Sequence, residues 1–396
     1  MIKRILNPSL NRSFFLFGPR QVGKSTYVQS LLKKQDLYIN LLPQRIFLDY
    51  LRNPGLFRQE ILAHKQQYEK FTCIVDEIQK IPALLDEVHD LIENHGIRFI
   101  LTGSSARKLK RGAANLLAGR ASTYYLYPCT YSELKEQFDL ERILLEGSLP
   151  YLWSNATNNI ITINQEDKKE FLQSYTEVYL REEIQAEGIV RNIAPFARFI
   201  DIAANNDGEI VNYSNIAREC GISLKTIKEY YQILEDTFIA YRIDPWIKSI
   251  RKRLISHPKY YLFDLGITNT LCHQYLALNP EVRGRRFEQF IILQFIAINH
   301  YFRFGFEYFF WRTSSGLEID LILTLAKNPV AAIEIKSTTT VVNSDSYALS
   351  EFKKEYPTVT TYIVAPVSRT RLLSSGVQVI PWQDFLEHEL KKLSLQ

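Results

Sequence analysis

The sequence has few cysteines and no long apolar run. Its four cysteines, at positions 73, 129, 220 and 272, lie far apart, and no pair has the spacing of a metal site. Scattered thiols of this kind fit a reduced cytosolic protein better than a disulfide scaffold. The apolar run FFLF near the N-terminus is too short for a signal peptide, and no run of about 18 apolar residues exists. We therefore expect a cytoplasmic protein without a membrane span.

The chain also lacks a strong charge bias, internal repeats and a low-complexity linker. Its 48 basic and 43 acidic residues give a net charge of +5, which permits nucleic-acid binding but does not argue for it. Basic residues gather at 248–253 and 283–286, and a solvated face explains either run. With 396 residues, the chain is too long for one average core, so we expect about two to three domains.

Three regions separate by their patterns, and together they predict an α/β protein. Residues 1–160 alternate short apolar strands with helical stretches, which indicates βαβ units and a parallel sheet of the P-loop NTPase kind. Residues 165–275 have helical spacing, and residues 276–396 return to mixed α/β. The strands expected in the first region are 13–17, 46–49, 72–77, 98–104 and 122–128.

One segment matches the phosphate-binding pattern G-x-x-x-x-G-K-[ST], between a predicted strand and a predicted helix. Its glycines let the backbone fold round phosphates, so that N–H groups and the helix N-terminus point inward. Lys24 should reach the β- and γ-phosphates of ATP, and Ser25 should hold Mg²⁺. The predicted ATP-binding residues are Gly18, Pro19, Arg20, Gln21, Val22, Gly23, Lys24, Ser25 and Thr26.

A second motif, TCIVDE at 72–77, is an apolar strand that ends in two acids. Asp76 is expected to bind the magnesium ion through water or through the shell of Ser25. Glu77 is expected to orient and polarise the attacking water. A GTPase or a small-molecule kinase usually lacks the second acid, so the pair favours an ATPase with Glu77 and Lys24 as catalytic residues.

Three further residues have open interpretations. Ser104 and Ser105 end the strand 98–104, where they are either phosphate-sensing groups or the N-cap of a following helix. Arg120 is either an arginine finger that reaches a neighbour's nucleotide, and hence a third catalytic residue, or a surface salt-bridge arginine. A finger would require subunits that act on one another, so a homo-oligomer is one expectation for assembly.

The segment 211–230 predicts a helix-turn-helix. Ser214 is expected to cap its first helix, Gly221 to form the tight turn and Ser223 to cap the second helix. In a DNA reader the early residues of the second helix enter the major groove. The candidate DNA-binding residues are therefore Ser223, Lys225, Thr226 and Lys228. The alternative is a module that only packs or contacts proteins.

The C-terminal region contains a candidate nuclease-like site. Asp320 ends GLEID at a strand, and Glu334 and Lys336 share one face of the next strand because the side-chain period is two. Carboxylates on adjacent strands can bind a second divalent metal, with Lys336 polarising water or phosphate and Glu288 completing the site. This pattern suits phosphodiester hydrolysis. The alternative is an inherited fold whose polar residues now serve stability or binding.

In these residues the chain resembles a family of bacterial and archaeal AAA-type ATPases with a C-terminal domain of unknown function. The resemblance is carried by GPRQVGKST, IVDEIQKIP, ILTGSS, LLAGR, SYTEVYLREEI, the helix-turn-helix, YYLFDLGI, GRRFEQF, GLEID and IEIKS. It implies nucleotide binding at the P-loop, magnesium and hydrolysis at Asp76 and Glu77, a winged helix and a restriction-endonuclease-like C-terminal fold. This chain departs from its relatives at 181–184, where it has REEI in place of an Arg-Asp-Ile-like run.

These expectations leave two functions to compare. The first is an ATP-driven switch or motor that acts on nucleic acid, which predicts DNA binding that falls steeply with salt. The second is a signalling ATPase whose C-terminal half is a protein-interaction module with an inactive nuclease-like fold. A small-molecule kinase is disfavoured, because no lid-like arginine set follows the P-loop and the chain carries two extra modules.

Overall fold

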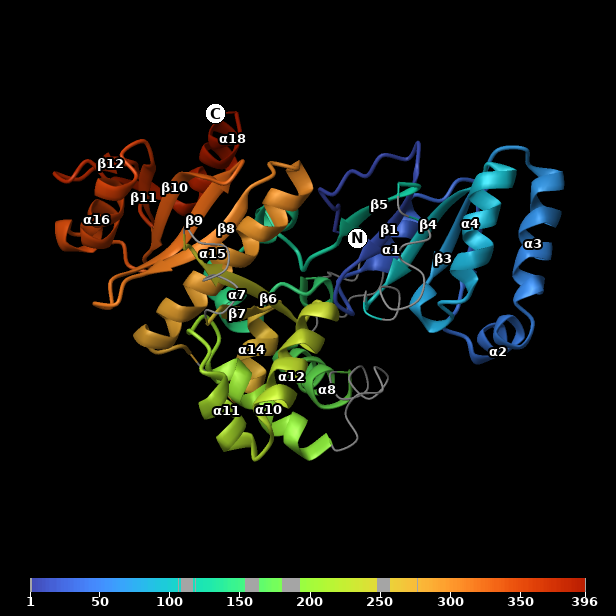
Figure 1. Ribbon diagram of the computed structural model, residues 1–396, viewed down its shortest axis with the longest axis horizontal. Coiled ribbons are helices and arrows are strands. Elements are labelled where there is room, and N and C mark those ends of the chain that lie inside the picture. The colour runs from blue at the N-terminus through green and yellow to red at the C-terminus, as the bar shows by residue number, and fades with distance from the viewer. Residues whose placement is uncertain are drawn as a thin grey trace.

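The computed structural model describes residues 2–105, 107, 117, 119–153, 164–179, 193–247, 257–275 and 277–395. Figure 1 shows a parallel sheet with its helices at one end, a second sheet at the other end, and a helical region beneath and between them. The predicted basic run at 248–253 and the departure at 181–184 lie outside the described residues.

The N-terminal sheet is parallel, with strand order β2-β3-β4-β1-β5. Strand β1 is buried along its whole length, and its alternate side chains enter two different cores. Phe14 and Leu16 face one core, while Phe15 and Phe17 face the other, as expected for a parallel sheet covered on both sides. The strands are β1 Ser13–Phe17, β2 Leu37–Asn40, β3 Thr72–Asp76, β4 Arg98–Gly103 and β5 Ala121–Tyr125.

One predicted strand is wrong. Residues 46–49 lie inside a helix, and the missing strand is β2, earlier in the chain. The apolar letters of IFLD belong to a helical stripe, because Ile46 and Phe47 pack with Tyr50 against the same core. The helices of this region are α1 Lys24–Ser30, α2 Gln44–Arg52, α3 Pro54–Gln67 and α4 Leu84–His95.

The middle region is helical, as predicted, and contains the helix-turn-helix. Gly221 ends the first helix with a left-handed φ of 67°, and the Ser223 hydroxyl accepts the Thr226 N–H at the start of the second. The first cap was predicted wrongly: Asn212, not Ser214, caps that helix by accepting the Asn215 N–H. The described helices of this region are α8 Gln165–Ser174, α10 Ile193–Asn205, α11 Tyr213–Cys220, α12 Leu224–Asp236 and α14 Leu265–Leu271, and two helices precede it in the chain, α6 Tyr131–Leu134 and α7 Leu140–Glu146.

The second sheet has eight described strands in the order β12-β13-β11-β10-β9-β8-β6-β7. Two of them, β6 and β7, come from the helix-turn-helix region, so that region and the C-terminal region share one sheet. The strands are β6 Ala240–Pro245, β7 Lys259–Leu262, β8 Glu307–Arg312, β9 Glu318–Leu325, β10 Asn328–Ile335, β11 Thr360–Ala365, β12 Arg371–Leu372 and β13 Gln378–Pro381. The helices are α15 Pro280–Phe302, α16 Tyr347–Glu355, α17 Trp382–Asp384 and α18 Leu390–Leu393.

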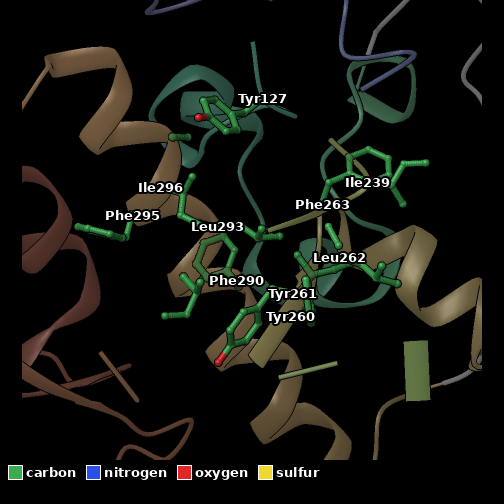
Figure 2. Packing of buried hydrophobic residues seen from close by; sticks show 14 of the residues in the cluster. Tyr127, Ile239, Tyr260, Tyr261, Leu262, Phe263, Phe290, Leu293, Phe295 and Ile296 are labelled. Atoms are coloured by element: carbon green, nitrogen blue, oxygen red, sulfur yellow. The ribbon is translucent and has the colours of Figure 1, made fainter. Parts of the chain in front are cut away.

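Helix α15 is the central packing element. Thirteen of its 23 residues are buried. Figure 2 shows Phe290, Leu293 and Ile296 of this helix facing a group that includes Tyr127 and residues 260–263, at and just after the end of β7. Its last turn reaches the N-terminal sheet, where His300 accepts the Tyr125 N–H at 2.9 Å. Within the described part of the chain, no helix is long and apolar enough to cross a membrane.

Candidate nucleotide site

The loop between β1 and α1 has the backbone of a phosphate cradle. Gly18 and Gly23 have φ values of 150° and 89°, and Gln21 adopts a left-handed φ of 63°. A Cβ at Gly18 would lie 2.2 Å from the Leu126 carbonyl oxygen, so only glycine fits there. Helix α1 begins at Lys24, directly after the loop, and its first N–H groups face the loop.

The predicted P-loop side chains take distinct positions. The Lys24 ammonium is buried and donates to the carbonyl oxygens of Gly18 and Pro19, both at 2.8 Å. Ser25 is half-buried beside it, and Thr26 is exposed on the helix surface. Lys24 thus lies over the loop, where its charge faces the space that phosphates would occupy.

The sheet register brings the two acids to the same edge as the P-loop. Strand β4 lies between β1 and β3, with Phe17 opposite Gly103 and Val75 opposite Leu101. Because carboxyl ends of parallel strands meet at one edge, the P-loop, Asp76 and the end of β4 adjoin each other.

Hydroxyl groups that the sequence did not indicate fix Asp76. Its carboxylate is fully buried and accepts the Tyr38 hydroxyl at 2.7 Å and the Thr102 hydroxyl. Burial, then the hydrogen bond to Asp76, raises the pKa of Tyr38, because both favour the protonated phenol. The Ser25 hydroxyl and the Asp76 carboxylate are oxygen donors of the kind that Mg²⁺ prefers.

Glu77 is held in a defined place. It has a left-handed φ of 63°, its N–H donates to the Thr102 hydroxyl at 3.0 Å, and its carboxylate accepts the Gln79 amide. The same amide donates to the Ser104 hydroxyl at 3.0 Å, so Ser104 joins this group. Gln79 is a site residue that sequence reasoning missed, although it lies in the DEIQ segment.

The remaining predicted positions of the ATPase region lie in other surroundings. The buried Ser105 hydroxyl accepts the Arg107 N–H at 3.3 Å, in the manner of a helix cap. Arg120 forms an ion pair with Glu93 of α4. The structure thus brings together Lys24, Asp76, Glu77 and Ser104 at one sheet edge.

Helix α12 presents its basic residues outward. Ser223, Lys225 and Lys228 are exposed, while the Thr226 hydroxyl lies 2.8 Å from that of Ser223. Lys228 also extends over the Tyr213 ring, 5.6 Å from its centroid. The exposed lysines give this face the positive charge that binding to a phosphate backbone requires. Among the predicted DNA-binding hydroxyls, those of Ser223 and Thr226 contact each other.

The C-terminal candidate residues also come together, with a lysine among them. Lys336 donates to Glu334 at 2.7 Å, and the Asp320 carboxylate accepts the Ile335 N–H at 2.7 Å. Burial, then the negative charges of Glu334 and Glu288, raise the pKa of Asp320 well above its ordinary value.

The unexpected member of this cluster is Lys259 of β7, whose side chain is only 4% exposed. Its ammonium lies 2.5 Å from Glu318 and 3.5 Å from Glu288, and Tyr261 donates to Glu288 at 2.6 Å. The acidic cluster therefore contains an internal cation. Among the described residues, no group of three or more His, Cys, Asp or Glu side chains has an arrangement that could hold a metal ion.

Three regions of the chain match known families. Residues 10–135 match the AAA domain family, residues 137–281 match a domain of unknown function (DUF8612), and residues 283–385 match another (DUF4143).

Several curated proteins are similar over most of the chain. Uncharacterized proteins of Mycobacterium tuberculosis and Mycobacterium bovis are each 26% identical over 331 residues, which is 82% of this chain and 70% of theirs. An uncharacterized protein of Methanocaldococcus jannaschii is 23% identical over 274 residues, 64% of this chain and 61% of its own. Among solved structures, the Aeropyrum pernix ORC1 protein in complex with DNA matches with a TM-score of 0.32 and 11% identity, over 66% of this chain and 86% of that one.

The parallel sheet, its P-loop and the AAA match agree on the class: the N-terminal region of this α/β protein has a P-loop on a parallel sheet and matches the AAA domain family. More particularly, it joins that domain to two C-terminal domains of unknown function. The resemblance drawn from the sequence motifs is confirmed at this level.

Proposed function

We propose that this protein hydrolyses ATP with Mg²⁺ and couples the reaction to nucleic-acid binding. The observation that carries the proposal is the convergence of Lys24, Asp76 and Glu77 at one sheet edge beside the P-loop. A bound magnesium ion would neutralise charge on the β- and γ-phosphates.

The chain's own residues supply the remaining chemistry. Gly18 and Gly23 leave room for the phosphates, and Lys24 exchanges its two carbonyl partners for phosphate oxygens. Hydrogen bonds from Tyr38 and Thr102 orient the Asp76 carboxylate, which would bind the magnesium ion together with the Ser25 hydroxyl. Glu77 accepts a proton from the attacking water.

Nucleotide binding is tested with a fluorescent ATP analogue. The wild-type protein should bind it, and Lys24→Ala should lower the affinity at least about tenfold, because a charge-assisted bond to phosphate is lost. Lys33→Ala is the control, since it removes the same charge just beyond the end of α1. Equal affinity for the wild type and Lys24→Ala would refute the site.

The coupling to nucleic acid is supported by the exposed Lys225 and Lys228 on the second helix of the helix-turn-helix. We expect duplex DNA binding that weakens steeply with salt, and weaker binding with a shallower salt slope in Lys225→Ala/Lys228→Ala. Fluorescence anisotropy at several salt concentrations measures both. Binding that is absent, or independent of salt and of both lysines, would reject this coupling.

A second candidate is a regulatory ATPase whose nuclease-like C-terminal fold binds a protein and does not cleave DNA. Lys259 favours it, because its ammonium already pairs with Glu288, one of the carboxylates that a metal would need, and with the neighbouring Glu318. Plasmid cleavage with Mn²⁺, with and without ATP, separates the two. Cleavage that Asp320→Ala abolishes would make the protein an ATPase-linked nuclease; intact plasmid with active ATP hydrolysis would favour the regulatory function.

A further inference from the structure

An arginine from outside the P-loop motif contacts the P-loop backbone. Arg4 precedes β1 in the sequence, and its side chain is only 6% exposed. Its guanidinium donates to the Val22 carbonyl at 2.7 Å and to the Tyr127 carbonyl at 2.5 Å. It also forms an ion pair with the fully buried Glu133 at 3.0 Å. Val22 belongs to the P-loop itself, so this buried cation is fixed against the phosphate cradle.

Holding the Val22 carbonyl also sets the direction of the next N–H. The described chain contains no cis peptide bond, and in a trans peptide the C=O and the following N–H point in opposite directions. The Val22 carbonyl points at Arg4, so the Gly23 N–H points away from Arg4. Gly23 is the last residue before α1, where a phosphate would be bound.

The same guanidinium also contacts helix α15. Arg4 donates to the Tyr301 hydroxyl at 3.2 Å, and that hydroxyl also accepts the Tyr127 N–H at 3.1 Å. Tyr301 lies in the last turn of α15, whose buried side chains pack with the C-terminal sheet. One buried network therefore joins the P-loop, the end of β5 and the helix that supports the C-terminal region.

A second P-loop carbonyl is held from the middle region. The Tyr175 hydroxyl donates to the Arg20 carbonyl at 3.3 Å, which orients the peptide leading to Gln21 in the same way. Gln21 has an unfavourable left-handed φ for a side-chain-bearing residue, so its peptide needs such support. Side chains from outside the parallel sheet thus orient two peptides of the cradle.

We infer that Arg4 is a positioning residue of the nucleotide site: it orients the Gly23 N–H toward the phosphates and, through Tyr301, connects the P-loop to helix α15. This inference rests on the proposed ATP site, and it adds a structural connection between that site and the C-terminal domains. Arginine suits this position because its planar guanidinium donates in several directions at once, whereas a lysine ammonium on a flexible stem cannot reach all four partners.

The first test is Tyr301→Phe, which removes one hydroxyl and retains the ring. We expect its dissociation constant for ATP to rise about fivefold, the usual weight of one hydrogen bond. Tyr362→Phe is the matched control, since that hydroxyl donates to Glu389 at 3.0 Å at the far side of the C-terminal sheet. Arg4→Lys should raise the constant about tenfold while the protein stays folded.

The second readout is amide hydrogen exchange with and without ATP. In the wild type, ATP should slow exchange in the last turn of α15, and Tyr301→Phe should abolish that effect while the P-loop remains protected. A purely structural role of Arg4 would lower thermal stability but leave ATP affinity and the ATP-dependent exchange unchanged, and that result would overturn the inference. Failure of the wild type to bind ATP would instead overturn the proposed function.

Discussion

Glu77→Gln separates ATP binding from ATP hydrolysis. Glu77 follows β3, its N–H donates to Thr102, and its carboxylate accepts the Gln79 amide. A glutamine has the same shape, and its amide oxygen can still accept from Gln79. The substitution therefore removes the charge and the basicity of the side chain and leaves its position intact.

The size of the effect follows from that single loss. A positioned general base contributes about 10²–10⁴ in rate, so the turnover number should fall at least about a hundredfold, or roughly 2.7 kcal/mol of transition-state stabilisation. The affinity for ATP should change by less than about threefold, because the P-loop N–H groups and Lys24 carry phosphate binding.

The assay measures phosphate release in a single turnover, together with equilibrium binding of a fluorescent ATP analogue. Glu69→Gln is the control: it makes the same change of charge at an exposed turn before β3. Turnover of Glu77→Gln equal to that of the wild type would show that another group positions the water.

Three further predictions concern stability and turnover. Gly147→Ala should lower the unfolding free energy by about 3 kcal/mol or more, seen as a reduced melting temperature, because its Cβ would lie 2.1 Å from Asp264 Oδ1 at a φ of 80°. An unchanged melting temperature would contradict this packing. Burial, then the nearby Arg303 charge, lowers the pKa of His300 to about 4, so the stability it contributes should be present above pH 6.5 and lost as pH falls toward 4. The loss is at most about 3 kcal/mol, and chemical denaturation of the wild type and His300→Gln across that range measures it; identical pH slopes would contradict it. Arg120→Ala should lower the turnover number for ATP hydrolysis while the affinity for ATP stays nearly unchanged. An unaltered turnover number would show that Arg120 does not act as an arginine finger.

The site residues that could be predicted from sequence lie in local motifs. The P-loop and the strand that ends at Asp76 are each continuous in the chain, and their glycines and acids follow directly from phosphate and magnesium chemistry. The helix-turn-helix was recognisable for the same reason, although its first cap is Asn212 instead of Ser214. A cap depends on which of several suitable polar residues starts the turn, and local sequence does not decide that.

The residues that sequence reasoning missed depend on contacts between distant segments. Tyr38 reaches Asp76 only because β2 pairs with β3, and β2 was itself assigned to the wrong segment. Lys259 meets Glu288 and Glu318 only after β7 joins the C-terminal sheet. No local pattern marks a lone tyrosine or lysine for such a role.

The most direct test of the account is multiple-turnover ATP hydrolysis by the 396-residue chain. Phosphate release is measured for the wild type and Lys24→Ala with Mg²⁺, and for the wild type with the ion chelated. The account predicts turnover that requires both Mg²⁺ and Lys24. Phosphate release that persists at the same rate in Lys24→Ala, or no release from a wild-type protein that is folded and binds ATP, would contradict it.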